Sequence, residues 1–188
     1  MKKLVLGLGL VASSFMVNAA PVAYKIDPAH TATLFSWNHF GFSTPTANFT
    51  DIQGTINVDE AQPEKSSVNV TIPVSSVNSN VTALNQEFQK ADWFDAQQYP
   101  TITFKSTKVE TKDKKHFKIT GDLTVKGITK PVVLNAVLNK KGVHPMTKAQ
   151  AIGFNATTSF NRAAFGIGKF VPNVSDKITV NITTEASL

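Results

Sequence analysis

Residues 117–138 carry the pattern that most constrains the fold of this chain, an alternation of apolar and polar side chains. Before residue 127 the apolar positions are Phe117, Ile119, Leu123 and Val125. After a break at 127–131 the apolar positions resume at Val132, Leu134, Ala136 and Leu138. Because successive side chains of a strand point to opposite faces, this segment is predicted to be a β-hairpin with one apolar face and one polar face.

Similar alternation recurs along the chain, and glycine, proline, asparagine and aspartate mark the breaks. Strands are predicted over residues 23–27, 31–38, 49–58, 67–74, 101–110, 115–126, 132–139, 148–161 and 176–186. One short helix is predicted over residues 81–91, where Leu84 and Phe88 are spaced four apart and Ser79 or Asn80 is the expected cap. No repeat or linker divides residues 20–188, so this segment is predicted to form a single domain.

These antiparallel strands, with only one helix to cover them, must hide their apolar faces against one another. A two-sheet sandwich and a closed barrel both do so, and the many aromatic residues favour the barrel because each buries a large area. Lysines on the second face, such as Lys105 and Lys118, argue against an outer-membrane barrel, whose outer band is uncharged. The predicted fold class is all-β, a soluble antiparallel barrel of about eight strands with one short helix and an apolar interior.

Residues 1–19 have the layout of a cleavable signal peptide, and the mature chain is predicted to be periplasmic or secreted. Lys2 and Lys3 precede an apolar run at 4–15, and small residues precede a cut after Ala19. The chain has no cysteine, so the exported domain is expected to rely on core burial for its stability. Removing the two leader lysines leaves 17 basic and 13 acidic residues, a mild excess without the basic, aromatic-interleaved stripe of a nucleic-acid site.

The sequence lacks the common catalytic motifs, since it has no Gly-x-Ser-x-Gly, no Ser-x-x-Lys and no phosphate loop. Its four histidines do not have the spacing of metal ligands, so no metal site is predicted. Asp27 and His30 are the closest carboxylate–imidazole pair, and His39 follows the same aromatic strand. The favoured interpretation is that these histidines form hydrogen bonds at a strand end or at the barrel rim and that the protein is not an enzyme.

Aromatic residues are the most prominent candidates for a functional role. A long apolar ligand gains about 0.8 kcal/mol for each methylene that it buries, so a tunnel can hold it with few polar contacts. The residues predicted to line such a tunnel are Phe35, Trp37, Phe40, Phe42, Phe49, Trp93, Phe94, Ile102, Phe104, Phe154, Phe160 and Phe165. The alternative is that most of these side chains simply form the core.

Several segments, taken in order, resemble the YceI-like proteins, exported bacterial proteins that bind polyisoprenoids. The matching segments are YKIDPAHTATLFSWNHFGFS at 24–43, ADWFDAQQYPTITFKST at 91–107, ITGDLTVKGITKPVVL at 119–134 and FNRAAFG at 160–166. The resemblance implies a lipocalin-like barrel that binds an isoprenoid quinone, a polyprenyl compound or a fatty-acyl compound, and often a homodimer. It also implies roles in stress responses or quinone-related electron transport for some members. The polar residues expected at the rim are His30, His39 and Arg162.

Three hypotheses follow from these observations. The first is a periplasmic carrier or store of an apolar lipid, without a metal or other cofactor and with transient membrane contact. The second is an enzyme that acts on an apolar substrate through His30 and His39. The third is an interaction or stress-response module whose barrel is filled by its own side chains. A cavity too small for a long chain would favour the third hypothesis.

Overall fold

The computed structural model describes residues 20–188, so the predicted signal peptide lies outside the described residues. The strands are β1 (Val22–Ile26), β2 (Ala32–Ser36), β3 (Thr46–Phe49), β4 (Gln53–Val58), β5 (Ser67–Pro73), β6 (Val77–Asn78), β7 (Thr101–Thr111), β8 (His116–Val125), β9 (Ile128–Val143), β10 (Gln150–Asn161) and β11 (Lys177–Ser187). The α-helix is α1 (Thr82–Gln89). Four short 3-10 helices are η1 (Pro28–His30), η2 (Pro63–Lys65), η3 (Val74–Ser76) and η4 (Arg162–Phe165).

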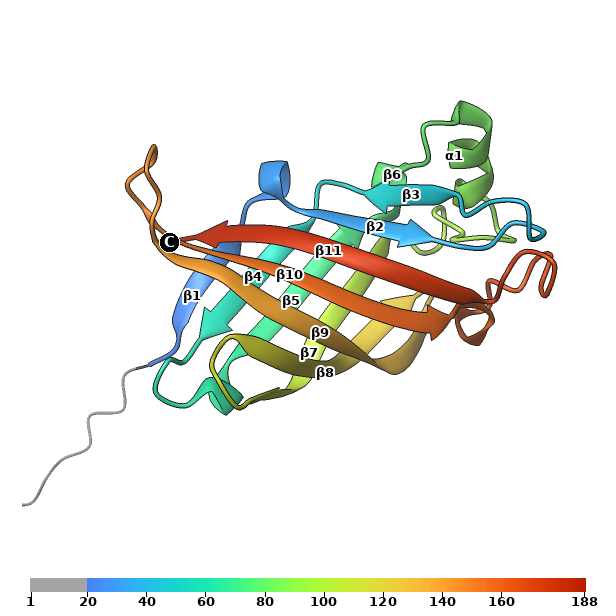
Figure 1. Ribbon diagram of the computed structural model, residues 1–188. Helices are drawn as coiled ribbons and strands as arrows, with labels where there is room; N and C mark the ends of the chain where they lie inside the picture. Colours follow the sequence, from blue (N-terminus) through green and yellow to red (C-terminus); the bar gives the residue numbers. More distant parts are fainter. Residues whose placement is uncertain (1–19) are drawn as a thin grey trace, which may run out of the picture.

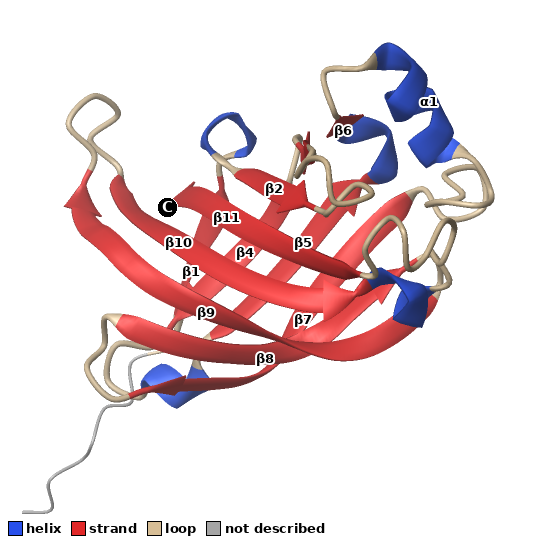
Figure 2. Ribbon diagram, turned by 45° about the vertical axis from the view of Figure 1, so that its right-hand side comes forward, coloured by secondary structure: helices blue, strands red, loops and turns tan. Residues whose placement is uncertain are grey.

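Eight strands close into an antiparallel barrel in the order β1, β4, β5, β7, β8, β9, β10 and β11 (Figures 1 and 2). The ring closes where β1 pairs with β11, with Lys25 opposite Ser187 and Ile26 opposite Ala186. Farther along, β11 pairs with β2, β2 with β3, and β3 with β6. The predicted fold class is confirmed. The long strands β7, β8, β9, β10 and β11 are consecutive neighbours in the barrel wall.

Three wall strands are interrupted, and the sequence patterns show only one of these interruptions, the break at 28–30 between the predicted strands 23–27 and 31–38. The predicted strand at 49–58 is two strands, β3 and β4, separated at 50–52. Asp51 has a positive φ of 54° there, and the turn places Ile52 in the core with 2% of its surface exposed. The helix η1 separates β1 from β2, and η3 separates β5 from β6. Each interruption lets the wall bend while it keeps its apolar side chains inward.

The hairpin of residues 117–138 forms with a tighter turn than its sequence suggests. The expected break at 127–131 shrinks to Lys126 and Gly127, and Pro131 lies within β9 opposite Asp122. Pro131 is tolerated because β10 pairs with β9 only from Asn135 onward, so β9 has one free side at the proline.

The helix α1 forms where predicted, but without the predicted cap. Val81 occupies the cap position and its side chain makes no capping hydrogen bond. The hydroxyl of Ser79 instead donates to the Asn85 side-chain oxygen over 2.7 Å. Phe88 is the buried residue of α1 and fixes the helix against the barrel end. We call this covered end the helix end, and we call the opposite end, where Glu60 follows β4, the Glu60 end (Figure 1).

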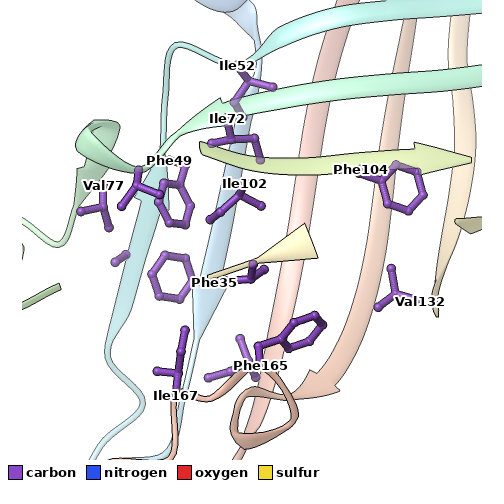
Figure 3. Close-up of a cluster of buried hydrophobic side chains, with 14 of the residues drawn as sticks. Phe35, Phe49, Ile52, Ile72, Val77, Ile102, Phe104, Val132, Phe165 and Ile167 are labelled. Atoms are coloured by element: carbon purple, nitrogen blue, oxygen red, sulfur yellow. The ribbon is translucent and has the colours of Figure 1, made fainter. Parts of the chain in front are cut away.

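The core lies inside the barrel and is made by the alternating inward positions of the strands. Figure 3 shows Phe35, Phe49 and Ile102 gathered on the inner side of the wall, from β2, β3 and β7. A smaller cluster around Tyr24 and Ile152 fills the Glu60 end. Its members Tyr24, Ile26, Ile56, Ile152 and Ala186 are all buried.

Replacing Gly121 by alanine should destabilise the barrel. A Cβ at this buried position would lie 2.4 Å from the ring of Phe104 and 2.7 Å from the Lys105 carbonyl oxygen. We expect Gly121→Ala to lower the free energy of unfolding by about 1–3 kcal/mol, as overpacked cores do. Gly153→Ala is the control, because the nearest atom to its new Cβ is 3.8 Å away. Urea denaturation measures both variants, and equal stability of the two would contradict this account.

Candidate functional site

The barrel is hollow, with an internal cavity of about 940 Å³ that runs between its two ends. Ten of the twelve predicted tunnel residues border it: Phe35, Trp37, Phe49, Trp93, Phe94, Ile102, Phe104, Phe154, Phe160 and Phe165. This volume is at the upper end of the range of about 300–1,000 Å³ that is typical of small-molecule pockets. A barrel filled by its own side chains, the third sequence hypothesis, does not describe this interior.

Inward-facing side chains in the middle of the barrel show the same hollowness. Leu134, Leu138, Phe154 and Val180 occupy inward positions of β9, β10 and β11, yet each keeps accessible surface because it borders empty space. The residues before and after them, such as Asn135 and Thr179, are exposed on the outer face. The alternation that the sequence shows in β9 and β11 therefore produces an apolar wall around a void.

Aromatic rings concentrate at the helix end of the cavity. The ring of Phe35 lies 5.7 Å from Trp37 and 5.4 Å from Phe49 in stacked arrangements. Phe88 of α1 meets Trp37 edge-on at 6.0 Å, and Phe94 meets Phe49 edge-on at 5.4 Å. Rings at these separations and angles attract one another beyond their burial, so the helix end is firmly packed. Sequence reasoning missed Phe88 as a lining residue, although its helical spacing from Leu84 was visible.

Phe40 and Phe42 were predicted to line the tunnel, and the structure corrects this prediction. They are 50% and 92% exposed and do not border the cavity. Both belong to the turn between β2 and β3, where a bridge between His39 and Ser43 folds the chain back. Phe40 adopts a positive φ of 53°, so the strand alternation that gave the prediction ends before it.

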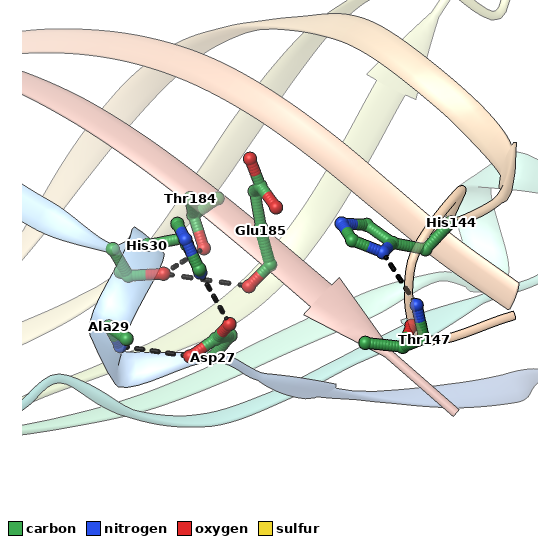
Figure 4. Close-up of polar contacts among 8 residues, drawn as sticks. Asp27, Ala29, His30, His144, Thr147, Thr184 and Glu185 are labelled. Atoms are coloured by element: carbon green, nitrogen blue, oxygen red, sulfur yellow. Dashed lines mark hydrogen bonds and ion pairs between the residues drawn. The ribbon is translucent and has the colours of Figure 1, made fainter. Parts of the chain in front are cut away.

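The two histidines proposed for catalysis do not share a site. His30 lies in η1, where its Nδ1 is 2.7 Å from the Asp27 carboxylate, and Figure 4 shows this contact. That hydrogen bond raises the pKa of His30 and, with a second bond from the Ala29 N–H, lowers the pKa of Asp27. His39 borders the cavity at the helix end. The extended strand β2, which has five residues and is roughly 16 Å long at about 3.3 Å per residue, lies between them.

Arg162 was predicted at the polar rim, and the structure instead buries it, with 6% of its surface exposed. Its guanidinium donates hydrogen bonds to the carbonyl oxygens of Ser175, Ile167, Lys169 and Val174, over 2.7–2.9 Å. Burial lowers the pKa of Arg162, and the charge of Asp176 opposes that shift. Because four of its five N–H groups are used, this side chain holds the connection between β10 and β11 across the helix end.

Ionisable side chains elsewhere in the cavity wall lie close to its ends. Lys169 pairs with Asp92 over 2.8 Å near the helix end, and Lys141 pairs with Glu60 at the other. Among residues 20–188, no three His, Cys, Asp or Glu side chains group as a metal site. Within the same residues, no helix has the length and apolar character needed to cross a bilayer.

Comparison with known proteins agrees with this geometry. The model of the YceI-like domain matches residues 24–186. A relative named Protein YceI from Escherichia coli O6:H1 is 37% identical over 188 residues, which covers 98% of this chain and 97% of the relative. The chain belongs to the YceI-like family. This membership confirms the resemblance found in the sequence motifs.

Two solved structures share the barrel fold of this YceI-like protein. The Campylobacter jejuni YceI protein is 27% identical with a TM-score of 0.72, covering 100% of this chain and 99% of that one. A polyisoprenoid binding domain from Saccharophagus degradans, implicated in plant cell wall breakdown, is 12% identical with a TM-score of 0.67. It covers 87% of this chain and 97% of that chain and shows the fold alone.

Replacing Arg162 by glutamine should destabilise the helix end. The change leaves at least two of four buried carbonyl oxygens without a donor, at about 1–3 kcal/mol each. We expect Arg162→Gln to lower the free energy of unfolding by about 3 kcal/mol or more. Hydrogen exchange should also quicken at residues 166–176. Lys177→Gln, at an exposed position on β11, is the control, and equal loss in both variants would contradict a specific role for Arg162.

Proposed function

We propose that this protein holds a long apolar lipid in the tunnel of its barrel and serves as a periplasmic carrier or store for it. The observation that carries the proposal is the cavity of about 940 Å³ inside a wall of aliphatic and aromatic side chains. Such a volume accommodates about thirty groups the size of a water molecule, each about 30 Å³. Isoprenoid quinones, polyprenyl compounds and fatty-acyl compounds all have a long hydrocarbon chain.

The energetics favour a chain-like ligand over a compact polar one. Ten methylene groups transferred from water into this interior contribute about 8 kcal/mol before the entropic cost of binding. The aliphatic middle of the tunnel offers contact along its whole length, with few groups that need a specific partner. A flexible hydrocarbon tail satisfies such a wall, whereas a small polar substrate would leave its hydrogen bonds unmade.

Family membership supports the same function. A structural neighbour is named a polyisoprenoid binding domain, and its barrel superposes on this one. The match is in fold only, so the ligand class for this chain remains the proposal. The catalytic alternative gains no support from His30 and His39, because His39 borders the cavity whereas His30 lies exposed in η1 and does not.

Extraction of the purified protein by organic solvent, followed by mass spectrometry, tests the proposal. The protein is expressed with its own leader and purified without detergent, so that it keeps any lipid acquired in the cell. We expect close to one lipid per protein chain. Absence of a stoichiometric lipid, together with no uptake of added ubiquinone, polyprenol or fatty acid, would contradict the proposed function.

A pair of tryptophan variants locates the lipid in the tunnel. Val180 borders the cavity from β11, and the neighbouring Thr179 points outward. Because an indole ring fills the middle of the tunnel only in Val180→Trp, we expect that variant to yield at least tenfold less extracted lipid per protein chain than the wild-type protein. Thr179→Trp should keep it. Equal lipid content in both folded variants would place the lipid outside the barrel.

A further inference from the structure

The Glu60 end of the tunnel carries a lysine on its inner face, after a long run of apolar side chains. In β9 the inward positions before it are Val132, Leu134, Ala136 and Leu138. A bulge then shifts the register, because Phe154 pairs with Leu138 whereas Gly153 pairs with Lys140. Lys141 follows opposite the buried Ile152 and borders the cavity, while Lys140 is exposed outside. A β-bulge is a common device for re-aiming a side chain in this way.

The ammonium group of Lys141 reaches across the end of the barrel. It forms an ion pair with the Glu60 carboxylate, which follows β4. This carboxylate and the Tyr24 hydroxyl on β1 both raise the pKa of Lys141. Two strands, β10 and β11, lie between β9 and β1 in the ring, so Lys141 spans the opening instead of contacting a neighbour. Lys114, from the turn between β7 and β8, donates to the Glu60 carbonyl oxygen over 2.9 Å. Two ammonium groups therefore converge on Glu60.

Glu60 is the more exposed member of its ion pair with Lys141. The Glu60 side chain is 67% exposed, whereas that of Lys141 is 28% exposed. A carboxylate at the surface returns to water at little cost, and exposed ion pairs contribute only about 0–1 kcal/mol. An anion that arrives through the tunnel can replace it and form a charge-assisted hydrogen bond with Lys141.

Other cations of the cavity wall do not offer such a site. Arg162 spends its N–H groups on backbone carbonyls, and Lys169 is tied to Asp92 at the helix end. Lys141 and Lys114 are the two lysines that border the cavity at the Glu60 end. Two carboxylates, Asp59 and Glu60, border the cavity at the same end, and buried Asp59 accepts a hydrogen bond from the Gln62 N–H over 2.8 Å. Once Glu60 is displaced, the two ammonium groups outnumber the remaining carboxylate, so an anionic group at one end of an apolar chain matches this arrangement of charge.

We infer that Lys141, assisted by Lys114, binds the anionic head group of the tunnel lipid, a carboxylate or a phosphate, and displaces the carboxylate of Glu60. The inference rests on the proposed lipid-binding function and names the class and orientation of its ligand. The head group lies at the Glu60 end and the hydrocarbon tail extends toward the aromatic helix end. A fatty acid and a polyprenyl phosphate share this chemistry.

Paired ligands that differ only in charge test the inference. Binding of a long-chain fatty acid is compared with that of its alcohol, and binding of a polyprenyl phosphate with that of its polyprenol. Quenching of the tunnel tryptophans Trp37 and Trp93 reports each Kd after delipidation. For wild-type protein we expect at least one anion to bind tenfold more tightly than its neutral partner. The anion that shows this preference identifies the source of the head group.

Three variants assign that preference to Lys141. Lys141→Met should weaken binding of the anion about tenfold and leave the alcohol unchanged, whereas Lys140→Met, on the outer face, should change neither. Glu60→Gln should tighten binding of the anion, because the competing carboxylate is gone. This opposite sign keeps the test decisive even if Lys141→Met folds poorly.

Equal binding of anions and alcohols by wild-type protein would overturn the inference and leave the lipid-binding function standing. Equal effects of Lys141→Met and Lys140→Met on the anion would also overturn it. Failure of every ligand to bind would instead reject the proposed function itself. The two failures are therefore distinguishable in one set of titrations.

Discussion

The closure of the sheet on itself is the constraint on which the rest of this structure depends. Every long strand has one apolar face, and α1, the single α-helix among residues 20–188, is too short to cover a sheet of that size. Pairing of β1 with β11 removes both free edges and turns all apolar faces toward one interior. Because closure fixes the circumference, the number of strands sets the space that the wall encloses, and the inward side chains decide how much of that space stays empty.

The side chains fill that interior unevenly. Rings crowd the helix end, and Tyr24 with its isoleucine neighbours fills the Glu60 end. Between these clusters the inward positions carry valine and leucine of moderate size, and small residues such as Ala136 and Ala156. These side chains are too short to meet across the barrel, so the middle stays hollow. The hollow part of the cavity therefore lies between two packed clusters.

Much of the fold was predictable because alternation is a local property. The hairpin at 117–138, the helix α1 and the closed barrel follow from spacing and composition. The break at η1 was also predicted, between the strands at 23–27 and 31–38, but the interruptions at η3 and residues 50–52 were not, since each depends on where two distant strands must bend together. Phe40 shows the same limit, because its aromatic neighbours suggest a strand while a positive φ at that residue turns the chain outward.

The candidate site was predictable for residues whose inward position follows from the alternation of side chains along a strand, such as Phe104 and Phe154. It was not predictable for Arg162, whose partners are backbone carbonyls brought near it only by the loop after η4. Lys141 also escaped detection, because the bulge that selects it over Lys140 is a matter of pairing with β10. Parity arguments identify the wall of a barrel, but its ends are built by loops and bulges.

Chemical asymmetry between the ends gives the tunnel a direction. At the helix end the charged groups near the cavity are already committed, Lys169 to Asp92 and Arg162 to carbonyl oxygens. At the Glu60 end the pairing of Lys141 depends on an exposed carboxylate that water solvates well. An elongated ligand with one polar end would therefore gain more in one orientation than in the other. The barrel itself, being apolar along its length, supplies affinity without orientation, so the direction of binding must come from the few charged residues at its ends.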